Sequence, residues 1–505
     1  MNKSKKSILN ALAALTQMFV VSIIGLILNK TIINVYGSDY NGINSTITQI
    51  VSTLMILEGG FSLASNVALF EPFGKKDYTK VNGILAATAK RFFVIGVISF
   101  IVGLIIIFIY PFTVTTQMPR QMIVGLMFTA LIPVSYNLAF NMKYRVMILT
   151  DQKEYVISLL TAVTYLFGNG IAIFLMLNGS SIFFARVAIM AFMLINYWII
   201  AIYCKKKYQF ARLNVTPDYR SIKGTKSVVI LKITSVVYSS MPIVIISTIP
   251  GIGVLLASVY AVYKSIIAVV KDSLTSITNA PRLAFGALLS EGRSDEIKQR
   301  FNQYEMLSFI GISTIVGTTI LLIIPFVELY TKGVQDVQYK DTLLAIILLS
   351  TVILEILHIP SGQIIQMKGD FSVARKIQSV AFIILAICMI IGRVMWGFYG
   401  IVMSVLVAAL SLAIMEIYYT NAKILNRSIL QVLKNMIPCI VLCSIAALIG
   451  LNELITISNY FEFVFVGSIS VIVLGTISVV VYYIIDKESL KSILKMFKNF
   501  IIQKK

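Results

Sequence analysis

Long apolar runs recur along the whole chain, and short polar segments, most of them basic, separate these runs. A helix needs roughly 20 apolar residues to cross a hydrocarbon core of about 30 Å. By that measure the sequence predicts about 14 membrane spans, near residues 8–29, 45–70, 92–112, 121–142, 155–177, 181–204, 228–249, 254–279, 306–330, 342–367, 377–396, 398–420, 436–451 and 463–485. The pattern therefore indicates an all-α integral membrane protein.

Composition supports this interpretation. Of the 505 residues, 58% are hydrophobic and 13% are charged, whereas about a quarter of the residues in a soluble domain are charged. No soluble core could bury so much apolar surface, so a series of soluble domains is excluded. The four cysteines lie in or at the ends of apolar runs. This placement favours neither a disulfide framework nor a cysteine-based metal site.

The net charge of +21 carries topological information. Lys and Arg concentrate in the cytoplasmic loops of membrane proteins. With the N-terminus placed inside, the predicted spans leave four basic residues outside (Lys30, Arg120, Lys332, Lys340) and four within helices (Arg186, Lys264, Lys271, Arg393). The remainder lie in or beside cytoplasmic segments. The sequence thus predicts a multi-pass protein of the bacterial cytoplasmic membrane, with both termini cytoplasmic, that attracts anionic membrane lipids and does not bind nucleic acid.

The chain shows a weak internal repeat. Shifting its first half so that Gly37 falls on Gly251 also brings Glu58 onto Asp272 and Ser62 onto Ser276. Transporters are often built from such repeats, and their substrates bind where the halves meet. The last two spans would then be an addition to a body of about twelve helices.

One stretch resembles a known family. Tyr36-Gly37, then Tyr40-Asn41-Gly42, and finally Leu57-Glu58-Gly59-Gly60-Phe61 are similar to the first two helices of Wzx-type polysaccharide repeat-unit flippases. These belong to the multidrug/oligosaccharidyl-lipid/polysaccharide exporter (MOP) superfamily, with the lipid II flippase and the multidrug and toxin extrusion (MATE) transporters. The family's acidic residue is more often Asp, so the role of Glu58 is not carried over directly.

The resemblance implies two six-helix lobes around a cavity that opens to alternate sides of the membrane. It also implies an undecaprenyl-diphosphate-linked oligosaccharide that moves from the inner to the outer leaflet for surface polysaccharide biosynthesis. A polysaccharide polymerase and glycosyltransferases would be partners. The corresponding segments are an N-terminal lobe (1–204), a basic cytoplasmic linker (205–227), a C-terminal lobe (228–422), two further spans (423–485) and a basic amphipathic cytoplasmic tail (486–505).

Charged residues inside the spans are the candidate site. An ionised side chain at the bilayer centre costs roughly 2.5–3.5 kcal/mol, so it needs a partner or a watery cavity. Lys264 and Lys271 are seven residues apart and share a helix face with Tyr260. Two ammonium groups on one stripe would suit a diphosphate, and Arg186, nearer the outer face, is a further predicted substrate contact. The alternative is that the lysines pair internally with two acids, Glu58 and Asp272.

Glu355 and His358, the only histidine, are three residues apart on the tenth predicted span. Histidine titrates near neutral pH, so this pair could couple transport to protons. The alternative is a hydrogen-bonded pair buried between helices. A metal site is not predicted, because Glu-x-x-His supplies only two ligands. Glu416 is placed near the inner face, where its charge can reach water.

A cation-coupled multidrug or small-molecule antiporter of the same superfamily is the alternative function, since Glu58, Asp272 and Glu355 are acids that could face a cationic drug. An enzyme is not predicted: the outer loops are short and no nucleotide-binding glycine motif follows a strand. No cofactor is expected. The sequence leaves open the sugar, the oligomeric state, and whether Na⁺, H⁺ or the membrane potential drives the cycle.

Overall fold

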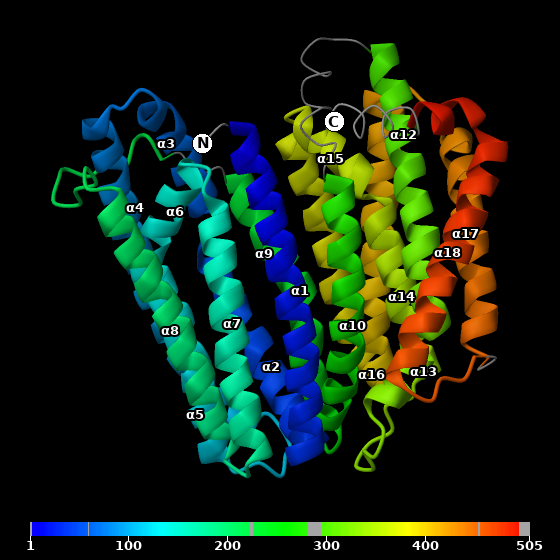
Figure 1. Ribbon diagram of the computed structural model, residues 1–505, viewed down its shortest axis with the longest axis horizontal. Coiled ribbons are helices and arrows are strands. Elements are labelled where there is room, and N and C mark those ends of the chain that lie inside the picture. The colour runs from blue at the N-terminus through cyan, green and yellow to red at the C-terminus, as the bar shows by residue number, and fades with distance from the viewer. Residues whose placement is uncertain (1–2, 59, 223–225, 280–293, 453–454, 494–505) are drawn as a thin grey trace. The chain divides into compact units, whose positions relative to one another are not determined.

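Helices make up the regular structure of the computed structural model, which describes residues 3–58, 60–222, 226–279, 294–452 and 455–493 (Figure 1). No strand occurs in those ranges. The first helices are α1 (Lys3–Tyr36), α2 (Ser38–Leu54), α3 (Phe61–Gly74), α4 (Tyr78–Ile109), α5 (Arg120–Tyr136), α6 (Met142–Thr150), α7 (Glu154–Leu177) and α8 (Ile182–Lys207). They are followed by α9 (Lys226–Ser247), α10 (Gly253–Asn279), α12 (Ser294–Gly311), α13 (Gly317–Tyr330), α14 (Thr342–Leu357), α15 (Ile359–Met367), α16 (Phe371–Tyr419), α17 (Ile429–Gly450) and α18 (Tyr460–Ile485). The short helical segments are η1 (Met55–Glu58), η2 (Tyr110–Phe112), η3 (Asn137–Asn141), η4 (Ile312–Val316) and η5 (Thr420–Ile424).

Every predicted span has a helix in the described residues. In the part of the chain that the structure describes, eleven helices are long and apolar enough to cross a membrane, or twelve if η1 and α3 continue α2 as one bent span. α9 contains a shorter apolar helix, and α16 contains the two predicted spans 377–396 and 398–420. Large apolar side chains cover the outside of the bundle, with Phe461, Val394 and Ile484 the most exposed at 84%, 82% and 78%. Such a surface suits lipid and not water, so the chain is an all-α, multi-pass membrane protein.

Gly397 divides α16 into the two predicted spans. Its φ of 55° lies in the left-handed region that glycine adopts without steric cost. Beyond it the chain turns back. The evidence is the close approach of the two segments, since a Cβ on Gly392 would come within 2.4 Å of the Gly400 carbonyl oxygen. α16 is therefore two helices that reverse at Gly397.

Contacts divide the chain into two compact units, one of Met1–Ala261 with Val334–Val337 and one of Val262–Gly333 with Gln338–Lys505. The predicted lobes, 1–204 and 228–422, do not coincide with this division. The reason is that α9 packs on α2 and so groups with the first unit.

In the first unit, α1 lies along α7, and α7 lies along α8 (Figure 1). Small residues let the other helices approach closely, as is usual in membranes. A Cβ on Gly42 of α2 would come 2.0 Å from the Val254 carbonyl oxygen of α10. Beside this contact the Asn41 Nδ2 donates to Ser258 Oγ at 2.8 Å, in the buried core.

In the second unit, α14 packs along α16, while α17 and α18 both pack on α13. A Cβ on Gly450 of α17 would lie 2.5 Å from the Leu321 Cα of α13. The last two helices are therefore integrated into this unit.

Two predicted cytoplasmic segments are partly helical. The predicted loop 281–305 is helical from Ser294 onward, where α12 begins. In the predicted tail, Leu490 and Ile493 are buried at 3% and 6% exposure. The sequence predicts that these two residues share one apolar helix face of the tail with Leu494, Phe497 and Ile501, which lie outside the described residues.

Candidate functional site

The lysine stripe of α10 is held by an acid from α14. The Lys271 Nζ lies 2.8 Å from the Glu355 Oε2. The lysine side chain is 38% exposed and the glutamate side chain 12%, so the pair is partly open. Lys271 therefore pairs with an acid of the protein, as the alternative interpretation predicted. The acid is Glu355, whereas the sequence suggested Glu58 and Asp272.

Lys264 lies about two turns along α10 from Lys271 and is half-buried. The Lys271 ammonium and the Glu355 carboxylate both act on it electrostatically. Asp272 is exposed at the next position after Lys271, whose charge acts on it. The second unit therefore places two ammonium groups within electrostatic range of one partly buried carboxylate.

The two tyrosines of α10 are covered. Tyr260 is 3% exposed and belongs to the first unit. Tyr263 is fully buried; its hydroxyl donates to the Tyr339 carbonyl oxygen at 3.1 Å and accepts from the Asp341 backbone N–H at 3.0 Å. Tyr263 therefore fixes α10 to the segment before α14, which is a structural role.

The expected pairing of Glu355 with His358 is wrong. His358 ends α14, and its Nδ1–H donates to the Glu416 Oε2 at 2.8 Å. Because α14 stops at Leu357 and α15 begins at Ile359, His358 lies at a helix junction, and its side chain meets α16 and not the previous turn of its own helix.

Glu416 is also more buried than the sequence indicates, at 3% exposure. Its carboxylate approaches the backbone of α15 because Gly362 has no side chain: a Cβ there would come 2.4 Å from the Glu416 Oε2. The predicted access of the Glu416 charge to water is therefore wrong, whereas its position near the inner face stays a prediction. The carboxylate instead forms a buried contact with the only histidine.

The remaining predicted site residues belong to the first unit. Glu58 ends η1 and is 9% exposed. Arg186 is half-buried in the second turn of α8, with Tyr165 of α7 as its titratable neighbour. Neither residue shares a unit with Lys264 or Lys271. Direct substrate contact by Arg186 stays a prediction.

The glycines paired by the internal repeat share a backbone conformation. Gly37 has a φ of 90° and separates α1 from α2, while Gly251 has a φ of 82° and lies between α9 and α10. Non-glycine residues rarely adopt these angles. The two turns thus have the same backbone conformation, which is consistent with the repeat but also occurs at other helix ends, such as Gly179 and Gly369.

A buried ion pair in the second unit was missed from the sequence. The Arg427 Nη2 lies 2.5 Å from the Glu305 Oε2, and both side chains are 4% exposed. The Arg427 Nε also donates to the Asn421 Oδ1 at 2.7 Å, and its guanidinium lies over the Phe301 ring at 5.2 Å. Both charged residues fall in predicted loops, so the span pattern gave no signal for this pair.

A second charged cluster joins α1 to the turn between α6 and α7. Asp151 receives Lys153 Nζ at 2.5 Å, Lys6 Nζ at 3.1 Å and the Tyr208 hydroxyl at 2.9 Å. Burial acts to raise the pKa of Asp151, but the hydrogen bonds from these three residues outweigh it and hold the pKa below its usual range. The cluster fixes one end of α1 within the first unit.

Replacing Asp151 by Asn is expected to lower the free energy of unfolding at pH 7 by about 1–3 kcal/mol, because two ammonium groups lose their carboxylate. The loss should appear as a lower melting temperature in detergent. A carboxyl group whose pKa is lower in the folded state stabilises the protein fully when the pH is above its unfolded-state pKa of about 4. That stabilisation is lost as the pH falls through the folded-state pKa. Melting curves of the wild type and Asp151→Asn should therefore converge in acid. An equal difference at pH 7 and below pH ~3 would contradict the ionised role.

Metal ligation has no support in the described ranges, where no group of three or more His, Cys, Asp or Glu side chains could hold an ion.

Comparison with known proteins supports the fold. No protein-family model matches the sequence, and no curated protein matches it. An inward-facing MATE family multidrug resistance transporter of the MOP superfamily superposes with a TM-score of 0.67 and 13% identity, covering 82% of this chain and 98% of that one. The lipid II flippase MurJ, in an inward closed conformation, gives 0.68 and 11%, covering 94% and 98%. A MOP superfamily transporter from Pyrococcus furiosus gives 0.53 and 13%, covering 85% and 98%.

These neighbours are transporters and a flippase, and none of the three is an enzyme. The match to the lipid II flippase extends over more of this chain than the match to the MATE transporter does. The chain therefore has the fold of the MOP superfamily of transporters and flippases.

Proposed function

We propose that this protein is a flippase that moves undecaprenyl-diphosphate-linked oligosaccharide repeat units from the inner to the outer leaflet of the bacterial cytoplasmic membrane by alternating access. The observation that carries the proposal is the pair of lysines on α10, of which Lys271 is bound to Glu355. The diphosphate is the part of such a lipid that loses most hydration in mid-membrane, and ammonium groups offset that loss.

The Glu355 pair gives the proposed cycle a way to bind and release. An incoming diphosphate contacts Lys264 and competes with Glu355 for Lys271. When Lys271 returns to Glu355, at the 2.8 Å separation seen here, the diphosphate loses one of its two cations. A carboxylate that exchanges with the substrate in this way gives Lys271 a counter-charge both before and after the substrate binds.

A cation-coupled antiporter is the second candidate, and it rests on Glu58, which is an acid only 9% exposed. The two functions differ in what accumulates when the protein is lost. Depletion in cells should trap lipid-linked oligosaccharide in the inner leaflet, where a membrane-impermeant sugar probe cannot reach it, and should leave drug sensitivity unchanged. Normal exposure of the lipid-linked sugar together with raised drug sensitivity would favour the antiporter.

His358 is the proposed site of proton coupling. Its imidazole faces the Glu416 carboxylate, and an imidazole can gain and lose a proton. Transport should therefore depend on pH, and His358→Gln should flatten that dependence because glutamine keeps a hydrogen bond but does not titrate. An unchanged pH profile in transport assays of His358→Gln would show that protons do not act through this residue.

A further inference from the structure

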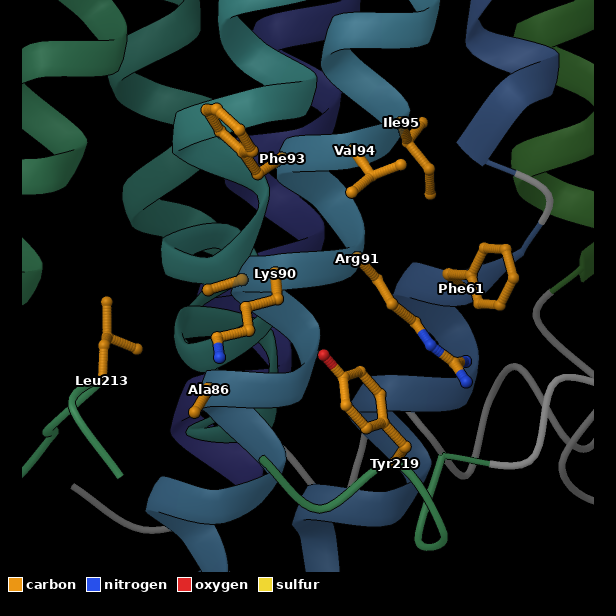
Figure 2. A pocket seen from close by; sticks show the side chains of 10 residues that line it. Phe61, Ala86, Lys90, Arg91, Phe93, Val94, Ile95, Leu213 and Tyr219 are labelled. Carbon is orange, nitrogen blue, oxygen red and sulfur yellow. The ribbon is translucent and has the colours of Figure 1, made fainter. Parts of the chain in front are cut away.

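The first unit carries a cationic cavity that the proposed transport path does not use. Its volume is about 640 Å³, and Figure 2 shows the side chains that line it. Lys90 and Arg91 come from α4, Phe61 from the start of α3, and Tyr219 from the segment after α8. The residues that line the cavity include no carboxylate.

The Arg91 guanidinium lies over two aromatic rings. Its Cζ lies 5.2 Å from the centre of the Phe61 ring and 5.4 Å from the centre of the Tyr219 ring. Figure 2 shows the guanidinium between these rings, with Lys90 on the other side of Tyr219. Rings that cover the faces of a guanidinium leave its N–H edge available, and that edge matches the geometry of a phosphate.

The segment that supplies Tyr219 is fixed on α4, so the cavity is preformed. The Asn82 side chain accepts from the Arg212 backbone N–H and donates to the Phe210 carbonyl oxygen, both at 3.0 Å. The Asp218 backbone N–H donates to the Gly83 carbonyl oxygen at 2.9 Å. The predicted linker 205–227 is therefore docked on the first unit up to the cavity.

The position along α4 indicates an amphiphilic ligand. The third predicted span begins at residue 92, which places Lys90 and Arg91 at the predicted inner boundary of the membrane. From the cavity an exposed apolar stripe runs along the same helix through Val94, Ile98, Ile101 and Ile105. These positions are three or four residues apart and so share one face. A cationic end and an apolar track fit a lipid with a phosphate head.

We infer that the Arg91 cavity binds the phosphate-bearing headgroup of an inner-leaflet lipid, whose chain lies along the apolar stripe of α4. The inference does not depend on the proposed function, because the cavity involves neither Lys264 nor Lys271. The same phosphate chemistry is offered by an anionic phospholipid and by a polyprenyl diphosphate.

Binding of each lipid to the purified full-length protein, measured by native mass spectrometry, tests the inference. The probes are phosphatidylglycerol and undecaprenyl diphosphate. Arg91→Ala should weaken binding of at least one of them by about tenfold, the loss expected for one charge-assisted contact. The lipid that shows the larger loss identifies the source of the headgroup. Arg91→Lys should weaken binding less, because it keeps the charge and loses the planar fork.

Arg120→Ala is the matched control, since the Arg120 guanidinium also lies over a ring, Phe112, at 4.6 Å, but at the predicted outer side. It removes the same charge and should not change binding of either lipid. If Arg91→Ala does not fold, Tyr219→Ala opens the same cavity and should also weaken binding. Wild-type affinity of folded Arg91 or Tyr219 variants for both lipids, or an equal loss in Arg120→Ala, would overturn the inference.

Discussion

Replacing Lys264 by Ala is expected to reduce transport of lipid-linked oligosaccharide at least about tenfold, the loss of one charge-assisted contact to the diphosphate, while the amount of protein in the membrane stays unchanged. The stripe on α10 would keep a single lysine, and that lysine is bound to Glu355 at 2.8 Å. The variant would then present one ammonium group to the diphosphate in place of two. Export of the sugar from cells that carry the variant measures the effect.

Two further variants separate this effect from a general loss of charge. Lys264→Arg keeps the cation and should retain part of the activity. Lys340 lies in a predicted outer loop of the same unit, and its Nζ is 2.8 Å from the Glu328 Oε1. Lys340→Ala therefore removes a lysine from a different ion pair. It should transport normally. Normal export by Lys264→Ala would remove this lysine from the site.

Replacing Arg427 by Ala is expected to destabilise the second unit by about 3–5 kcal/mol, because a buried carboxylate would lose the guanidinium that it contacts. Glu305 is 3% exposed. Arg427 lies just after η5, and its guanidinium contacts Glu305 of α12 and Asn421 of η5. Loss of the arginine therefore also separates two parts of the unit. Thermal unfolding in detergent should show a melting temperature lower by about 10 °C.

The double variant Arg427→Met with Glu305→Gln controls for the buried charge. Removing both ionic groups avoids the unpaired carboxylate and often restores stability, so it should melt well above the Arg427→Ala protein. An Arg427→Ala variant that melts with the wild type would show that the pair contributes nothing to folding.

The span pattern predicted the helices because the hydrocarbon thickness fixes their length. Every predicted span has a helix, including the two that meet at Gly397 in α16. The alignment of Gly37 with Gly251 could also be made from the sequence. Both residues have a positive φ, a conformation that strongly favours glycine. The packing of α9 on α2 could not be predicted, since apolar periodicity shows which face of a helix is buried but not which helix covers it.

The partners of the charged residues were less predictable than their positions. Glu355 and His358 share a helix face by spacing, yet one binds Lys271 on α10 and the other Glu416 on α16. The break between α14 and α15 directs these side chains to different helices. Arg427 and Glu305 carried no signal because both fall in segments where charges are ordinary.

The most direct test of the central claim is a leaflet-accessibility assay in liposomes that contain the purified protein and an undecaprenyl-diphosphate-linked oligosaccharide in both leaflets. A membrane-impermeant sugar-modifying reagent added outside should reach nearly all of the lipid with the wild type and only the outer-leaflet half with Lys264→Ala. Equal access with both proteins, or access no greater than in protein-free liposomes, would contradict translocation of a diphosphate lipid at the lysines of α10.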